Sequence, residues 1–221
     1  MKLTTCLMFL VFISLTYNCF SQEPPFWNDI QAFKTQDSIS MPPQHEILFV
    51  GSSSFTKWTD VQNYFPGHPI VNRGFGGSTL LDVMMYADNV ILPYQPKQII
   101  IYCGENDLAY SDTLSAITVA NRFISLFDII RHVWENVPIG FVSIKPSPSR
   151  AKLMPKMVET NKLIESFLKT KSNTAFIDVY HKMLDANGKP IGEIFTSDSL
   201  HMNAKGYAIW QKEIAPHLSE P

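Results

Sequence analysis

The sequence predicts a single α/β domain: a three-layer α/β/α sandwich around a mostly parallel sheet of about five strands. Short apolar runs without polar alternation recur along the chain, and such runs are typical of strands buried on both faces. Between them lie longer segments with apolar residues at every third or fourth position, which indicate amphipathic helices. Strand and helix patterns alternate throughout, which favours parallel strands joined by helical crossovers.

Length and composition agree with a globular domain. The chain has 221 residues, of which 45% are hydrophobic and 17% charged, enough for a sizeable core and unlike a disordered or fibrous protein. The formal net charge is -2, and the sequence contains no arginine-rich run. We therefore expect no nucleic-acid partner, because such binding requires a basic surface.

Residues 1–21 have the layout of a secretory signal peptide. Lys2 precedes an apolar run over residues 7–15, and a mostly polar tail follows. The apolar run is too short to span a bilayer comfortably. We expect a cleaved leader and a secreted or periplasmic protein without stable membrane insertion after its removal. An uncleaved anchor, or a lipid attached at Cys19, is the alternative.

The cysteines predict a mature protein without an internal disulfide. Of Cys6, Cys19 and Cys103, only Cys103 remains once the leader is removed. It ends an apolar run and is interpreted as a small buried hydrophobic residue. Stability must then come from the core.

The first predicted strand, residues 47–50, carries the main candidate for chemistry. It runs into Gly51 and then three serines. We expect this strand in the middle of the sheet and Ser53 at its carboxyl end, the edge where open α/β sheets bind ligands. Ser53 is the candidate nucleophile. Taken alone, the same residues also fit a solvated turn.

The other elements follow from the same two patterns. Further strands are expected over residues 69–72, 98–103, 139–144 and 175–179. Helices are expected within residues 22–45, then over 56–65, 79–92, 113–136, 154–169 and from a cap at Asn203 to about residue 217. The first helix is interpreted as an amino-terminal extension, residues 22–45, on a domain of residues 46–221.

Polar residues far apart in sequence follow the predicted strands and should meet at one edge of the sheet. Ser53 needs a base to accept its proton, and the imidazole of His201 can act near neutral pH. Asp198, three residues earlier, can orient that imidazole. An oxyanion would find donors in the main-chain amides of Ser53 and Gly77 and the side chain of Asn106. Each residue alone fits an ordinary loop; together they predict a serine hydrolase.

Four short sequence blocks resemble those of a known family. In these blocks the chain is similar to the SGNH hydrolases, the GDSL-type esterases and lipases. The blocks are residues 49–53, 72–77, 104–107 and 198–201. The resemblance covers the chain from residue 47 to its end. It implies a flavodoxin-like fold, ester hydrolysis through an acyl-enzyme, and no metal or organic cofactor.

The first block departs from the family pattern at one position. Ser52 stands where the family usually has an aspartate. The family's catalytic acid comes from the last block, so this change need not abolish activity. Ser53 aligns with the nucleophile, and Ser52 and Ser54 are the alternatives.

The substrate is predicted less directly. Short loops at a sheet edge favour small acyl groups on soluble carriers, so acetyl esters of carbohydrates are expected first. Long-chain lipid or lysophospholipid esters are the alternative. A non-catalytic exported carbohydrate-binding protein on the same fold is an alternative from another class. Five side chains that could line the rim stay unassigned: Arg73, Tyr110, Lys145, Arg150 and Met202.

Overall fold

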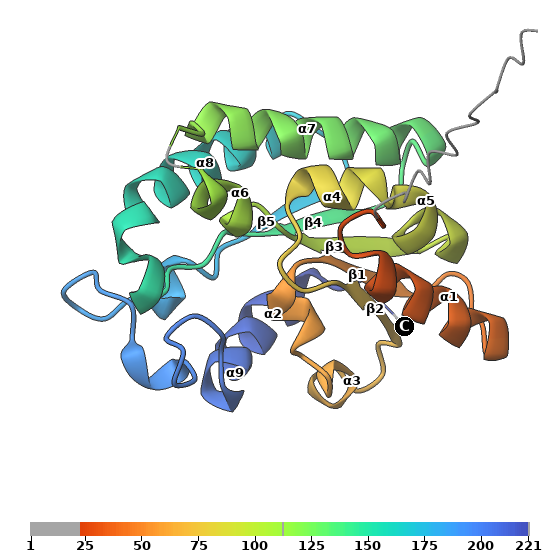
Figure 1. The fold of residues 1–221 in the computed structure, drawn as a ribbon, viewed down its shortest axis with the longest axis horizontal. Helices are drawn as coiled ribbons and strands as arrows, with labels where there is room; N and C mark the ends of the chain where they lie inside the picture. The colour runs from red at the N-terminus through yellow and green to blue at the C-terminus, as the bar shows by residue number, and fades with distance from the viewer. Residues whose placement is uncertain (1–22, 112, 221) are drawn as a thin grey trace, which may run out of the picture.

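The computed structural model describes residues 23–111 and 113–220, which form a five-stranded parallel sheet with helices on both sides (Figure 1). The order is β2-β1-β3-β4-β5, that of a flavodoxin-like fold. The strands are β1 (Ile47–Gly51), β2 (Ile70–Gly74), β3 (Gln98–Tyr102), β4 (Ile139–Val142) and β5 (Thr174–Ile177). The predicted three-layer sandwich is confirmed. The predicted leader, residues 1–21, lies outside the described residues.

The predicted position of the first strand was wrong by one place. β3 lies in the middle of the sheet, and β1 lies beside it with β2 on its other side. Both β1 and β3 are buried over their whole length, so an apolar pattern cannot tell the central strand from its neighbour. Gly51 pairs with Gly74 on one side and Tyr102 on the other. The three strands therefore end level with one another.

Two hydrophobic clusters cover the two faces of the sheet. One face is covered by α1 (Trp27–Ile39), α4 (Leu80–Met85), α5 (Ala87–Val90), α7 (Ala116–Val133) and α8 (Met154–Leu168), and the other by α2 (Ser53–Thr56), α3 (Val61–Tyr64) and α9 (Ala204–Ile214). Figure 1 shows α7 on one side of the sheet and α2, α3 and α9 on the other. None of the helices within residues 23–111 and 113–220 is long and apolar enough to cross a membrane.

Two predicted helices are each interrupted where a large aromatic side chain is buried. The helix predicted over residues 56–65 is instead α2 and α3, with the fully buried ring of Trp58 between them, stacked on Tyr207 at 4.7 Å. The helix predicted over residues 79–92 divides at Tyr86, whose backbone leaves the helical region. The Tyr86 hydroxyl donates to the carbonyl of Pro25 at 2.6 Å. In both places tertiary packing outweighs helix periodicity.

The long predicted helices are present, and the predicted cap at Asn203 is confirmed. The Asn203 side chain accepts hydrogen bonds from the main-chain amides of Lys205 and Gly206 at the start of α9. The sequence analysis missed α6 (Glu105–Tyr110), which is too short for a helical apolar pattern. It follows β3 directly and contributes Leu108 to the core.

The amino-terminal helix α1 is tied to the rest of the fold. Ile30 is fully buried in the main core. Asp37 accepts from Arg73 at 2.6 Å and also from the Tyr94 hydroxyl. Cys103 is buried as predicted, and burial raises the pKa of its thiol, which disfavours the nucleophilic thiolate.

Candidate active site

The candidate nucleophile lies at the sharp turn from β1 into α2. Gly51 has a φ of 139°, and the amide of Ser52 donates to the carbonyl of Tyr102 on β3 at 3.0 Å. Ser53 is then the first residue of α2, whose turn is closed by the Phe55 amide bonded to the Ser52 carbonyl at 2.9 Å. The turn places the Ser53 side chain beyond the carboxyl edge of the sheet.

The candidate base and acid lie on the loop before α9 and reach this serine. Nε2 of His201 is 3.1 Å from Oγ of Ser53, and Nδ1 of His201 is 2.6 Å from Oδ2 of Asp198. A carboxylate can only accept, so Nδ1 carries the proton and the neutral Nε2 accepts from the serine hydroxyl. The three predicted residues are thus linked by hydrogen bonds across 148 residues of sequence.

The loop holds the Asp198 carboxylate in position. Its Oδ1 accepts from the main-chain amides of Leu200 and His201, each at 2.9 Å, and from the hydroxyl of Thr196 at 2.8 Å. The hydrogen bonds from the His201 side chain and then its main-chain amide keep the pKa of Asp198 well below its usual value. The carboxylate is therefore charged at any pH where an esterase would be assayed, although 48% of this side chain is exposed.

The two alternative serines have different surroundings. Ser52 is only 3% exposed, and its hydroxyl accepts from Nδ2 of Asn106 at 2.8 Å. Ser54 is also buried, and its carbonyl accepts from the hydroxyl of Tyr207. The imidazole of His201 reaches Ser53, and this contact favours Ser53 among the three.

The predicted oxyanion donors come from neighbouring segments held together by α6. Nδ2 of Asn106 donates to the carbonyl of Ser78 at 3.0 Å, and the Tyr110 hydroxyl donates to the carbonyl of Gly77 at 3.0 Å. Gly77 has a φ of 86°, in the left-handed region that favours glycine. Asn106 is close to the nucleophile turn through its hydrogen bond to Ser52. The structure therefore brings the Gly77 and Asn106 segments together with that turn.

The sequence analysis missed a buried charged cluster behind Asn106. Glu105 contacts Nζ of Lys145 at 2.9 Å and a guanidinium nitrogen of Arg150 at 3.3 Å, and it accepts from the Tyr102 hydroxyl. Burial alone would raise the pKa of Glu105, but the charges of Lys145 and Arg150 and the hydrogen bond from Tyr102 lower it overall. The sequence signals were Glu105, which directly precedes Asn106, and the presence of Lys145 and Arg150 among the unassigned rim side chains.

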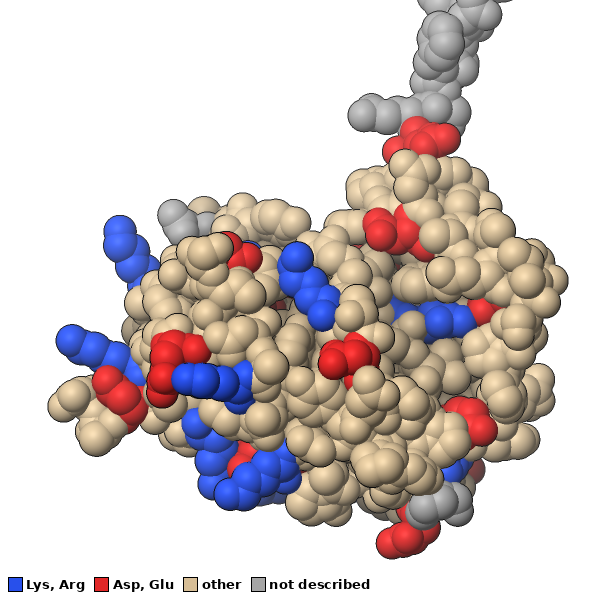
Figure 2. All heavy atoms as spheres, turned by 90° about the horizontal axis from the view of Figure 1, so that it is seen from below, with Lys and Arg blue, Asp and Glu red and all other residues tan. Residues whose placement is uncertain are grey.

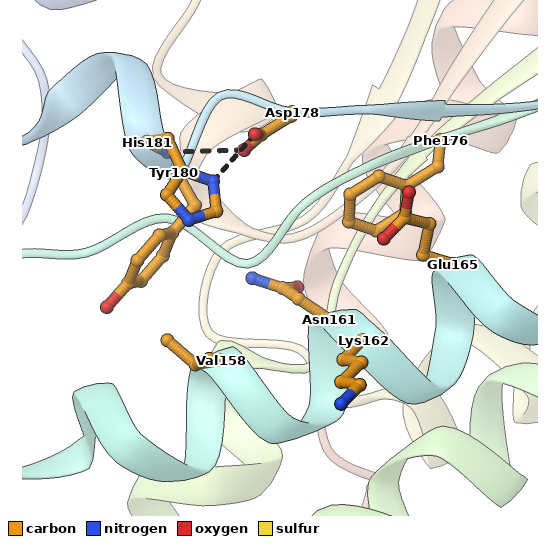
Figure 3. Close-up of a pocket in the computed structure, with 8 residues that line it drawn as sticks. All are labelled: Val158, Asn161, Lys162, Glu165, Phe176, Asp178, Tyr180 and His181. Atoms are coloured by element: carbon orange, nitrogen blue, oxygen red, sulfur yellow. Dashed lines mark hydrogen bonds and ion pairs between the residues drawn. The ribbon is translucent and has the colours of Figure 1, made fainter.

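A second Asp-x-x-His pair has the same spacing and the same side-chain contact as Asp198 and His201. Nδ1 of His181 lies 2.7 Å from Oδ2 of Asp178, beyond the end of β5 (Figure 3). The pair lines a cavity of about 410 Å³, together with Val158, Asn161, Lys162, Glu165, Phe176 and Tyr180. These eight lining residues include no serine, threonine or cysteine. The contact with Ser53 is what distinguishes the pair Asp198 and His201.

In the described part of the chain, the face drawn in Figure 2 does not carry a single kind of charge, and no cluster of metal ligands is found. Figure 2 shows basic and acidic side chains interspersed over one face of the molecule. Across residues 23–111 and 113–220, no group of three or more histidine, cysteine, aspartate or glutamate side chains is arranged to hold a metal ion.

Comparisons with known proteins agree with the fold and the sequence blocks. The model of the GDSL-like Lipase/Acylhydrolase family matches residues 37–209, a range that contains all five predicted site residues. This match confirms the resemblance predicted from the four blocks. No curated protein matches the chain significantly.

Solved structures share the fold at low sequence identity. A protein from Streptococcus pneumonia, provisionally described as a platelet activating factor, is 20% identical with a TM-score of 0.75, covering 87% of this chain and 92% of its own. A GDSL-like lipase from Bacteroides thetaiotaomicron is 18% identical with a TM-score of 0.70, covering 85% and 95%. An acetyl esterase with one serine replaced by alanine, in a structure with an acetate ion, is 13% identical with a TM-score of 0.59, covering 78% and 95%.

Proposed function

The chain belongs to the GDSL-like lipase/acylhydrolase family, and from that membership we propose that it is an exported serine esterase that removes short acyl groups, with acetyl esters of carbohydrates as its substrates. The family supports hydrolysis of an ester bond. Ser53 is the proposed nucleophile, His201 the base and Asp198 the orienting acid. The observation that carries the proposal is the continuous hydrogen-bonded path from Ser53 through His201 to Asp198.

The proposed reaction passes through an acyl-enzyme. The Ser53 hydroxyl gives its proton to Nε2 of His201 while Oγ forms a bond to the ester carbon, and the carbonyl electron pair moves onto oxygen. The carbonyl then re-forms as the bond between the ester carbon and the alcohol oxygen breaks, and the imidazolium gives its proton to that oxygen. In the second half, water gives a proton to Nε2 and attacks the acyl carbon, the bond to Oγ breaks, and the imidazolium gives the proton to Oγ, which releases the acid and frees the serine. Asp198 stabilises the imidazolium in both halves of the reaction.

The oxyanion formed in each half needs donors in place beforehand. The proposed donors are the main-chain amides of Ser53 and Gly77 and Nδ2 of Asn106. One Nδ2 proton is directed at the carbonyl of Ser78, and the other at the hydroxyl of Ser52. A substrate oxygen would compete with Ser52 for this second proton.

The short-acyl preference rests on the chemistry of the site and on one structural relative. Ser53 begins α2 shortly after β1, and Asn106 lies in the first turn of α6 shortly after β3, so the acyl group would bind close to the sheet edge. One protein with the same fold is described as an acetyl esterase, and the structure of its serine-to-alanine mutant contains an acetate ion. The leader layout of residues 1–21 supports export, which would give access to extracellular acetylated carbohydrates.

A panel of esters tests the substrate proposal. We expect the purified protein without residues 1–21 to release acetate from acetylated sugars and from p-nitrophenyl acetate. We also expect kcat/KM to fall steeply as the acyl chain lengthens from acetyl to octanoyl. Equal or faster turnover of lysophospholipids would contradict the carbohydrate preference and favour the lipid alternative. Absence of hydrolysis above the buffer rate on every ester would favour a non-catalytic carbohydrate-binding protein.

The role of Asp198 predicts a specific effect on the pH profile. Because its pKa is lowered, Asp198 stays ionised as the pH falls, so the loss of kcat/KM at acidic pH should not follow protonation of this carboxylate. Asp198→Asn should reduce kcat/KM by about 10³- to 10⁴-fold, because an amide neither fixes the tautomer nor stabilises the imidazolium. The measurement is kcat/KM against pH for both proteins. Recovery of wild-type activity by the variant at high pH would contradict the orienting role.

A further inference from the structure

Two cations and one carboxylate form the buried cluster behind Asn106. The Lys145 side chain is 1% exposed and the Glu105 side chain 6% exposed. Arg150, on the segment between β4 and α8, approaches the same carboxylate with Nη1. Glu105 therefore neutralises only one of the two cations, and an excess positive charge remains beside the candidate site. The neighbouring Asp107 is paired separately with Arg122 at 2.7 Å.

Arg150 also contacts the candidate oxyanion donor. Its Nη2 donates to Oδ1 of Asn106 at 3.0 Å. A primary amide can turn by half a rotation and exchange its oxygen and nitrogen, which would direct a carbonyl at the oxyanion. A guanidinium only donates hydrogen bonds and the Ser78 carbonyl only accepts them. The two contacts together allow one orientation, with the Asn106 nitrogen toward Ser52 and Ser78.

We propose that Arg150 is a positioning residue that fixes the Asn106 amide with its nitrogen toward the oxyanion and strengthens that donor through its own charge. The inference rests on the proposed esterase function. A hydrogen bond to Oδ1 draws electron density from the amide, which makes its N–H groups better donors. The benefit is largest when the substrate oxygen becomes negative, so the contact acts on the transition state more than on substrate binding.

The three charged side chains have separate parts in this arrangement. Glu105 holds the guanidinium through Nη1 and leaves Nη2 for Asn106. Lys145 occupies the other carboxylate oxygen. Without Lys145, Glu105 would bind Arg150 more tightly and its charge would cancel that of the guanidinium. The segment from Lys145 to Arg150 lies outside the four family blocks. Through these contacts it would set the orientation and donor strength of Asn106 in the third block.

The first measurement is steady-state kinetics of Arg150→Met and Arg150→Lys on p-nitrophenyl acetate. Removing one oxyanion donor costs about 10²- to 10³-fold in kcat, and an indirect effect should be smaller. We expect Arg150→Met to lower kcat by about 10- to 100-fold with KM changed less than about threefold. Arg150→Lys keeps the positive charge but loses the planar guanidinium, which can contact Glu105 and Asn106 at the same time. We expect it to retain more kcat than Arg150→Met.

Arg122→Met is the matched control. Arg122 is 20% exposed where Arg150 is 19%, and each contacts a buried carboxylate next to Asn106 in sequence. Loss of either arginine removes a positive charge beside a buried carboxylate, and this should lower thermal stability. Arg122 donates to Asp107, whereas Arg150 donates to the Asn106 side chain, so Arg122→Met should keep kcat within about threefold of wild type at a temperature where it is folded.

A double-mutant cycle with Asn106→Ala separates positioning from general damage. If Arg150 acts through the amide, adding Arg150→Lys or Arg150→Met to Asn106→Ala should change kcat by less than about twofold. The Lys variant keeps the test available should the Met variant fail to fold. Multiplicative effects in this cycle, or equal losses of kcat in Arg150→Met and Arg122→Met, would overturn the inference. A wild-type protein without ester hydrolysis would instead overturn the proposed function.

Discussion

Replacing Ser53 by alanine is expected to reduce ester hydrolysis by about 10⁴- to 10⁶-fold, the largest effect on activity of any single change considered for this chain. The hydroxyl is the group that His201 contacts, at 3.1 Å, and without it no acyl-enzyme can form. A small residual rate above the buffer reaction is expected, because the oxyanion donors and substrate binding remain. Steady-state hydrolysis of p-nitrophenyl acetate measures the loss.

Ser54→Ala and Ser52→Ala are the matched controls for the same measurement. Each deletes one buried hydroxyl next to Ser53 in sequence. Each should lower the rate by less than about tenfold, which corresponds to about 1 kcal/mol of activation free energy. Labelling with an organophosphonate, followed by mass spectrometry, should modify wild type and both controls but not Ser53→Ala. Full activity in Ser53→Ala with loss in Ser52→Ala would reassign the nucleophile to the position where the family usually has an aspartate.

The arrangement of the candidate site could be predicted from sequence because parallel strands place the residues that follow them at one edge of the sheet. Ser53 follows β1, Gly77 lies beyond β2, and Asn106 follows β3, so the topology alone brings these segments to one edge. The contact from His201 to Ser53 needed the further assumption that the last loop returns to this edge. The joint occurrence of these residue types in this order supported that assumption, the family blocks added to it, and the hydrogen bond agrees with it.

What could not be predicted depends on tertiary packing of single side chains. Trp58 and Tyr86 interrupt two predicted helices because burial of one ring, or one hydroxyl bonded to a distant carbonyl, outweighs local periodicity. Arg150 was unassigned because its contacts with Glu105 and Asn106 span more than 40 residues, and no spacing rule connects them. The position of β1 beside the central strand was hidden for a similar reason, since strands buried on both faces look alike in sequence.

Gly51→Ala is expected to have the largest effect on stability, and the close approach of β1 and β3 is the reason. A Cβ atom at Gly51 would lie 1.9 Å from the carbonyl oxygen of Tyr102, a main-chain atom of the paired strand. The φ of 139° is strained for any residue with a side chain. The cost should exceed about 4 kcal/mol, a large part of the roughly 5–15 kcal/mol that stabilises a typical domain.

The experiment is urea unfolding of Gly51→Ala beside Gly188→Ala. Gly188 also has a positive φ, 73°, but a Cβ there would meet nothing within 4 Å, so this control should lose only about 1–2 kcal/mol from backbone strain. A Gly51→Ala protein as stable as the control would show that β1 and β3 can separate without cost. If the variant folds with the strands apart, Ser53 should move from His201, because the Ser52 amide bonds the same Tyr102 carbonyl. Its esterase activity should then fall with its stability, whereas Gly188→Ala should keep both the serine contact and the rate.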